Sequence, residues 1–164
     1  MNLNALARHG AFGVEGVTGI VTARLADGAA LAKARVLPYQ LMATMGAVGA
    51  EVSAAVKAAL ETAFDASLVR VPKVEGRVIV CPDVSGSMGA PVTGYRKGAT
   101  TSVRCIDVAA LVASAMLRRN PATRVLPFAQ EVVHLPLDGG ATVAANAARL
   151  AAIGGGGTNV SAPP

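Results

Sequence analysis

The first seventy residues have the hydrophobic pattern of short amphipathic helices. Apolar side chains recur there at every third or fourth position, which is the spacing of a helix with one buried face. Residues 51–64 show it most clearly, with an apolar side chain at every fourth position: Val52, Val56, Leu60 and Phe64. Two earlier faces have related spacing: Leu3, Leu6 and Ala7, and then Val14, Val17, Ile20 and Val21. Short antiparallel helices with little else between them indicate a helical repeat array, although no strict sequence period is visible.

Turn-forming residues separate these predicted helices. Residues 26–28 read Ala-Asp-Gly and predict a turn, and residues 30–36 are expected to form a further short helix. That helix would end before Pro38, because the residue that precedes a proline is pushed out of helical backbone space. On the exposed side of the last predicted helix, Lys57 and Glu61 have the i,i+4 spacing of an ion pair.

The pattern changes at residues 71–76, which read Val-Pro-Lys-Val-Glu-Gly and predict a linker. The short apolar run that follows, residues 77–81, is bounded by turn residues and predicts a buried strand. Residues 102–119 are apolar nearly all round, so we expect a helix that is buried on a sheet. Asn120 and Pro121 would end that helix.

The last third of the chain continues with strands and a helix. Residues 124–128 and 132–135 predict the two strands of a hairpin that turns near Ala129 and Gln130. Residues 142–153 predict a helix with apolar side chains on one side: Val143, Ala147 and Leu150. A strand–helix–strand unit of this length predicts a doubly wound α/β sheet, in which ligands bind at the carboxyl ends of the strands.

An acidic residue and two hydroxyls follow the first predicted strand at alternate positions: Asp83, Ser85 and Ser87. A loop wrapped over a strand end can direct these side chains at one point. Hard oxygen donors with a single negative charge suit Mg²⁺ or Mn²⁺. Much later in the chain, four glycines lead to Thr158, which offers another hydroxyl beside very flexible backbone. The alternative interpretation of the first loop is a Ser/Gly turn whose side chains cap the next helix.

Taken together, these motifs resemble a known family. Asp83-x-Ser85-x-Ser87, followed by a Gly-Gly-Thr loop at Thr158, is similar to the metal ion-dependent adhesion site of von Willebrand factor type A domains. Four segments of the chain resemble the Ro/TROVE RNA-binding proteins in the same order and spacing: residues 33–39, 58–64, 83–88 and 156–163. This resemblance covers essentially the whole chain.

The resemblance implies how the chain is organised. In that family a ring of HEAT-like helical repeats is closed by a type A domain, so residues 1–70 would be the end of the repeat module. Residues 71–76 would be the linker, and residues 77–164 would be an incomplete, doubly wound (Rossmann-like) type A domain. The chain looks truncated at both ends. The strand at 77–81 would then pair on one side only, with residues 124–128, and an unpaired hydrophobic strand edge predicts poor solubility.

The resemblance also implies a function. Members of the family bind small noncoding (Y-like) RNAs and misfolded RNAs in ribonucleoproteins, and they are not enzymes. Matching the motif residue by residue assigns Asp83, Ser85, Ser87 and Thr158 as the metal ligands. A metal held in this way keeps open positions for a carboxylate from a protein partner. Asn159 stands where the family commonly has an acidic residue, which would weaken the local negative charge.

The chain has a formal net charge of +5. A basic excess of this size is compatible with a polyanion such as RNA, and equally with an ordinary solvated surface. The candidates for RNA contacts are Arg96, Lys97 and Arg104, because these residues follow the metal motif closely in the sequence.

Cysteine usage and hydropathy indicate the cellular compartment of the protein. Cys81 and Cys105 lack the spacing of metal ligands, so we expect buried free thiols in a reducing compartment. The N-terminus has no apolar core of signal-peptide length. The longest uncharged apolar-rich run, residues 36–50, is shorter than the ~20 residues that span a bilayer. We therefore expect a cytoplasmic protein without a membrane segment.

Two alternative functions remain open at this point. The first is a metal-dependent protein-interaction module with no role in RNA binding. The second is a serine hydrolase, since the sequence around Ser87 differs by one residue from a Gly-x-Ser-x-Gly nucleophile elbow. Its acid and base would be Asp107 and His134, but the histidine lies on a predicted strand and the next helix begins well after Ser87. The hydrolase is therefore the less favoured alternative.

Overall fold

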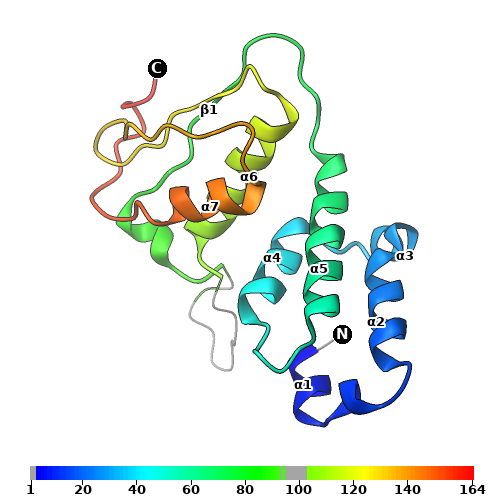
Figure 1. The fold of residues 1–164 in the computed structure, drawn as a ribbon. Coiled ribbons are helices and arrows are strands. Elements are labelled where there is room, and N and C mark those ends of the chain that lie inside the picture. The colour runs from blue at the N-terminus through cyan, green and yellow to red at the C-terminus, as the bar shows by residue number, and fades with distance from the viewer. Residues whose placement is uncertain (1–2, 93, 95–102) are drawn as a thin grey trace. The chain divides into compact units, whose positions relative to one another are not determined.

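The computed structural model describes residues 3–92, 94 and 103–164 (Figure 1). The chain divides into two compact units, Met1–Arg70 and Val71–Pro164. We call them the helical unit and the α/β unit, and describe each by itself. No helix in the described part of the chain is long and apolar enough to cross a membrane.

The helical unit consists of short helices joined by tight turns (Figure 1). Its helices, in chain order, are α1 (Leu3–Arg8), η1 (Ala11–Gly13), α2 (Val17–Ala26), α3 (Gly28–Lys33), α4 (Pro38–Ala47), α5 (Ala54–Ser67) and η2 (Leu68–Arg70). Helix α5 packs against α2 and α4 and so lies at the centre of this unit.

The periodicity of α5 is confirmed. Val56, Leu60 and Phe64 are all buried, and the hydroxyl of Ser53 accepts a hydrogen bond from the backbone N–H of Val56 at 3.4 Å. This N-cap places the helix start three residues later than predicted, because Ser53 satisfies a backbone N–H that the helix itself cannot. None of the ion pairs in the described part of the chain joins the i,i+4 residues of α5 singled out above.

The buried face that the sequence predicted for α2 is only partly correct. Val14 and Ile20 are 61% and 70% exposed, whereas Val21 and Leu25 are buried. The helix begins only after Gly16, whose left-handed φ of 82° ends the preceding turn. Since α2 starts there, Val14 lies outside the helix and cannot share its buried face.

Helix α4 was not predicted. The sequence analysis took Pro38 as the end of a helix over residues 30–36. The helix there, α3, instead runs over Gly28–Lys33, and Pro38 occupies the first position of α4. Proline favours that position, because its missing N–H would have no partner there in any case. Leu37 is extended (φ −90°, ψ 146°), as the residue before a proline should be.

The α/β unit is built around a parallel strand pair. Its elements are β1 (Ile79–Val80), η3 (Gly86–Gly89), α6 (Cys105–Arg119), β2 (Arg124–Val125) and α7 (Val143–Ala151). Ile79 lies opposite Arg124 in the parallel register, with α6 as the crossover. The predicted strand–helix–strand unit is therefore present, although both strands are shorter than expected.

The predicted hairpin forms only next to its turn. Phe128 bridges to Val132 in antiparallel fashion, and the backbone N–H of Val133 donates to the carbonyl of Pro127 at 2.7 Å. Beyond that point residues 133–137 diverge from β2 and line an open cavity of about 380 Å³ beside it. The prediction of a second hairpin strand at residues 132–135 is therefore wrong, since the described residues contain no strand there.

Helices α6 and α7 pack together and form the core of the α/β unit with the strands (Figure 1). The core combines three alanines and a leucine of the helices with valines of the strands: Ala110, Ala113, Ala147, Leu150, Val80 and Val125. The prediction for α7 is confirmed at Val143, Ala147 and Leu150. Helix α6 is less enclosed than predicted, since Val112 is 54% exposed. Its predicted first residue, Ser102, lies outside the described residues.

Asn120 ends α6 as predicted, and its side chain also bonds to the first residues of the α/β unit. Its side-chain amide donates to the carbonyls of Pro72 and Met116, both at 3.2 Å, and its side-chain oxygen accepts from the N–H of Val74 at 2.8 Å. These bonds attach residues 72–74 to the C-terminus of α6. Cys81 and Cys105 are free thiols, but both are only half-buried.

Candidate metal centre

The first loop of the site continues directly from strand β1. The N–H of Phe128 donates to the carbonyl of Pro82 at 3.0 Å, and the N–H of Val84 donates to the carbonyl of Phe128 at 2.9 Å. Strand-like pairing therefore extends past Asp83, which bridges to Phe128. The carboxylate lies at the carboxyl end of a parallel strand, where α/β sheets bind their ligands.

The side chains predicted as metal ligands lie together. The N–H of Ser85 donates to Asp83 Oδ1 at 2.8 Å, and the Oγ atoms of Ser85 and Ser87 are 3.2 Å apart. From the far loop, Thr158 Oγ1 donates to Ser85 Oγ at 2.7 Å. Ser85 is 1% exposed, whereas Ser87 and Thr158 reach solvent. Two segments more than seventy residues apart thus bring one carboxylate and three hydroxyls to one place.

The second loop, residues 154–158, owes its path to glycine. Gly154, Gly155 and Gly156 have φ angles of 29°, 128° and 75°, which favour glycine because other residues clash there. The two loops are also in backbone contact, since the N–H of Gly86 donates to the carbonyl of Gly156 at 3.0 Å. A Cβ at Gly86 would lie 3.3 Å from that carbonyl oxygen. The sequence analysis did not foresee this contact, because nothing in the glycine spacing indicates which backbones meet.

The donor set fits a hard divalent cation. A single carboxylate with three hydroxyl oxygens is the ligand type that Mg²⁺ and Mn²⁺ accept, and these ions complete their shells with water. In the described residues, no three His, Cys, Asp or Glu side chains gather into a metal-binding group. The candidate site therefore depends on its hydroxyls. The side-chain oxygen of Asn159 accepts a hydrogen bond from the N–H of Ser161 at 3.1 Å.

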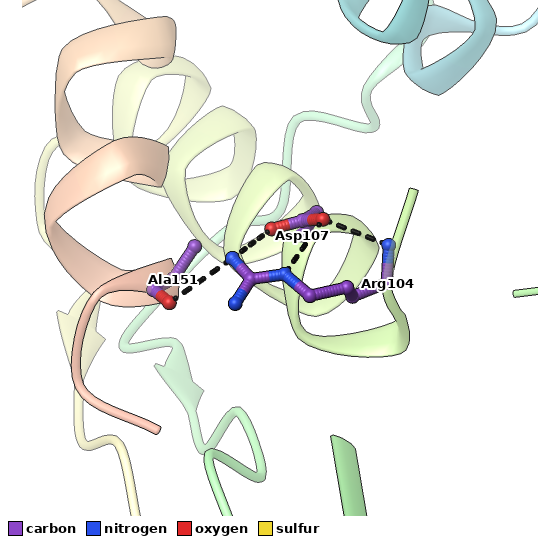
Figure 2. Close-up of polar contacts among 3 residues, drawn as sticks. All are labelled: Arg104, Asp107 and Ala151. Atoms are coloured by element: carbon purple, nitrogen blue, oxygen red, sulfur yellow. Dashed lines mark hydrogen bonds and ion pairs between the residues drawn. The ribbon is translucent and has the colours of Figure 1, made fainter. Parts of the chain in front are cut away.

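Arg104, a candidate RNA contact, is engaged within the protein (Figure 2). Its Nη2 lies 2.7 Å from Asp107 Oδ1 and its Nε lies 3.2 Å from Asp107 Oδ2. The hydrogen bond with Asp107 raises the pKa of the guanidinium above its usual value. Burial alone would raise the pKa of Asp107, but the hydrogen bonds and charge of Arg104 lower it by more, so it lies below its usual value. The other two candidates, Arg96 and Lys97, lie outside the described residues.

The arrangement that a serine hydrolase needs is not found among the described residues. Ser87 Oγ is paired with Ser85, and no hydrogen bond joins it to a histidine there. His134 instead lines the cavity beside β2, and Asp107 is held by Arg104.

Two of three comparisons with known proteins give matches. The family model of the Ro60 vWA domain matches residues 77–164. The crystal structure of the Deinococcus radiodurans Ro (RSR) protein has the same fold, with a TM-score of 0.64 and 23% sequence identity. That match covers 96% of this chain and 33% of the Deinococcus chain, so this chain spans about a third of its length. A search of curated protein sequences gave no match.

Proposed function

This chain belongs to the Ro60 vWA domain family, and on that premise we propose that it is an RNA-binding component of a ribonucleoprotein with a divalent-cation site. The RNA would be a small noncoding or misfolded RNA. The proposal gives the chain no catalytic role and places it in the cytoplasm, where its two free thiols would remain reduced.

The metal part of this proposal rests on one observation, the convergence of two distant loops at Ser85. Asp83, Ser87 and Thr158 all lie within hydrogen-bond reach of the backbone or side chain of Ser85. In our proposal these four residues hold Mg²⁺ or Mn²⁺, and the metal replaces the hydrogen bonds among the hydroxyls. The bound ion would supply a positive charge with open coordination positions.

The exposed side of the site indicates what would use those positions. Ser87 and Thr158 reach solvent, while Ser85 closes the inner side. A carboxylate from a protein partner can reach a metal from that open side, and it matches a hard cation in charge and chemistry. The same feature supports the alternative function, a metal-dependent protein-interaction module without RNA. The two differ in whether RNA binds at all.

The RNA part rests on family membership and on the basic excess of the chain. Of the net charge of +5, eight basic and four acidic side chains fall within residues 77–164, a difference of +4. Such an excess attracts phosphate, and its contribution to binding falls with salt. Because Asp107 compensates the charge of Arg104, the proposal relies on Arg96 and Lys97 for phosphate contacts more than on Arg104.

The salt dependence of RNA binding tests this part. A fluorescent noncoding RNA is titrated with the chain at several salt concentrations, and the slope of log K against log salt is compared between variants. Each lost phosphate contact lowers the slope by about 0.7–0.9, so neutralising Arg96 and Lys97 together should lower it by about 1.5. Neutralising Lys33 and Arg35 of the helical unit is the matched control and should leave the slope unchanged. Absence of RNA binding by the folded wild-type chain would leave only the protein-interaction alternative.

A further inference from the structure

Arg104 lies where the first loop of the metal site rejoins the core of the α/β unit. The N–H of Cys105 donates to the carbonyl of Ala90 at 2.9 Å, and Arg104 itself forms an antiparallel bridge with Pro91. Ala90 directly follows η3, the short helix that contains Ser87. The backbone at Arg104 is therefore fixed to the end of the first loop.

The side chain of Arg104 extends in the other direction, to the helix that leads into the second loop (Figure 2). Its Nη2 donates to the carbonyl of Ala151, the last residue of α7, at 3.3 Å. A cation at this end of a helix satisfies a carbonyl that has no partner within the helix. Asp107 fixes the direction of the guanidinium through Nε and Nη2, and it also accepts from the backbone N–H of Arg104 at 2.8 Å.

Ala151 is only a few residues from the glycines of the second loop. The N–H of Ile153 still donates to the carbonyl of Leu150 at 3.1 Å, so the chain keeps its attachment to α7 until Gly154. The four glycines that follow have wide backbone freedom, and the ends of the loop therefore determine where it lies. One end is α7, held by Arg104. The other is Asn159, whose N–H donates to the carbonyl of Ala129 at 2.8 Å.

We propose that Arg104 is a positioning residue that couples the two loops of the metal site. Its backbone holds the end of the loop that carries Ser87, and its side chain holds the helix that leads to Thr158. The inference rests on the proposed function in so far as these two loops form the metal site. The coupling itself is a property of the chain and exists without metal.

Helix α6 offers a matched control. Arg118, near its other end, donates from Nη1 to the carbonyl of Gly139 at 3.3 Å. The contact has the same chemistry and the same length as that of Arg104 with Ala151, but its acceptor precedes α7 and does not lead into either loop. Arg104→Gln and Arg118→Gln therefore remove equal charge and one comparable bond to a backbone carbonyl each. Arg104→Gln also removes the ion pair with Asp107, so Arg104→Lys, which keeps a charge opposite Asp107, serves as the second control.

The test is hydrogen exchange of individual backbone amides in the full chain without metal. The reporter is the N–H of Gly86, which bonds to the carbonyl of Gly156 and so monitors the contact between the loops. Arg104→Gln should speed its exchange about fivefold, as expected for loss of a partly exposed charged hydrogen bond. Arg118→Gln should leave it unchanged. Equal exchange of Gly86 in the two variants would overturn the coupling.

A conservative variant and a metal titration complete the test. Arg104→Lys keeps the charge opposite Asp107 but cannot span to Ala151, so Gly86 exchange should still rise. This variant decides the question if Arg104→Gln fails to melt cooperatively. With metal, Arg104→Gln should weaken Mg²⁺ affinity by a similar factor. If wild type binds no Mg²⁺ while Gly86 exchange still rises in Arg104→Gln, the metal site is wrong and the coupling stands. If Mg²⁺ binds and Gly86 exchange is unchanged, the coupling is wrong and the metal site stands.

Discussion

At the scale of single residues, the candidate metal centre is organised by Ser85. Its backbone N–H holds the carboxylate of Asp83, and its hydroxyl is 2.7 Å from Thr158 Oγ1 and 3.2 Å from Ser87 Oγ. Burying a hydroxyl costs free energy unless it is hydrogen-bonded, and the hydroxyl of Ser85 is bonded to other candidate ligands. The spacing of the motif predicted which residues would gather. The burial of Ser85, the middle residue of the motif, depends on the second loop and could not be predicted from the sequence.

The Arg104–Asp107 pair predicts a specific pH dependence of stability. The pKa of Asp107 lies below its ordinary value in the folded chain. Its contribution to stability is therefore fully present above the unfolded pKa of about 4 and is lost as the pH falls through the lower, folded pKa. At neutral pH, Asp107→Asn should lower the melting temperature by about 2 °C, a small value because the pair is partly exposed.

Melting of both proteins across acidic pH provides the measurement. The difference between wild type and Asp107→Asn should shrink as the pH falls below about 4 and vanish once Asp107 is protonated in the folded chain. A difference that stays constant down to the acid limit would mean that the carboxylate does not stabilise the fold through its charge.

At the scale of elements, the site depends on a loop whose shape only glycine allows. The glycine run predicted flexible backbone beside Thr158, but the glycines of the two loops of the site have different roles. Gly156 of the run has a φ of 75°, and its carbonyl accepts from the N–H of Gly86. Gly89, in η3 of the first loop, has ordinary φ and open space around it. Backbone angles and close approaches of this kind are determined by tertiary contacts, so the sequence did not distinguish these positions.

Substitution of these two glycines makes that difference measurable. Gly156→Ala places a Cβ at a left-handed backbone position and should destabilise the α/β unit by about 1–2 kcal/mol. It should also weaken Mg²⁺ binding, because the strained loop carries Thr158. Gly89→Ala is the control and should change neither quantity. Thermal melting and calorimetry measure both, and equal behaviour of the two variants would show that the loop conformation is unimportant.

At the scale of the whole chain, the pattern analysis predicted the parallel pair with its crossover helix and the burial of α5 and α7. It missed α4, because it took Pro38 as a helix end, whereas α3 already ends at Lys33 and Pro38 occupies the first position of α4. It also overestimated the number and the length of the strands. Residues 132–135 alternate as a strand does, but the alternation reports side-chain burial and does not ensure pairing with β2. The packing of the whole unit decides where such pairing ends.

Strand β1 has one unpaired edge within the described residues. The carbonyls of Val78, Val80 and Pro82 accept hydrogen bonds from residues of the β2 side. The backbone groups of Ile79 and Cys81 therefore point to the opposite edge, where no described strand lies. Ile79 is also 50% exposed. An edge of this kind favours pairing with other chains.

We therefore expect the chain to self-associate, with a melting transition that depends on protein concentration. Ile79→Lys should reduce the association, because a charge on an edge strand opposes pairing. Val112→Lys adds the same charge at a side chain of similar exposure on α6 and should not reduce it. Light scattering and melting at several concentrations give the answer. A cooperative, concentration-independent transition in wild type would contradict the expectation.

The central claim is that Asp83, Ser85, Ser87 and Thr158 hold a divalent cation, and calorimetric titration with Mg²⁺ and Mn²⁺ tests it most directly. Wild type should bind one ion, and Asp83→Ala should lose binding because it removes the only carboxylate of the proposed ligand set. Asp138→Ala, which removes an exposed carboxylate elsewhere in the α/β unit, should bind as wild type does. Absence of binding by well-folded wild type, or equal binding by Asp83→Ala, would contradict the claim and leave the Asp83 loop as a structural turn.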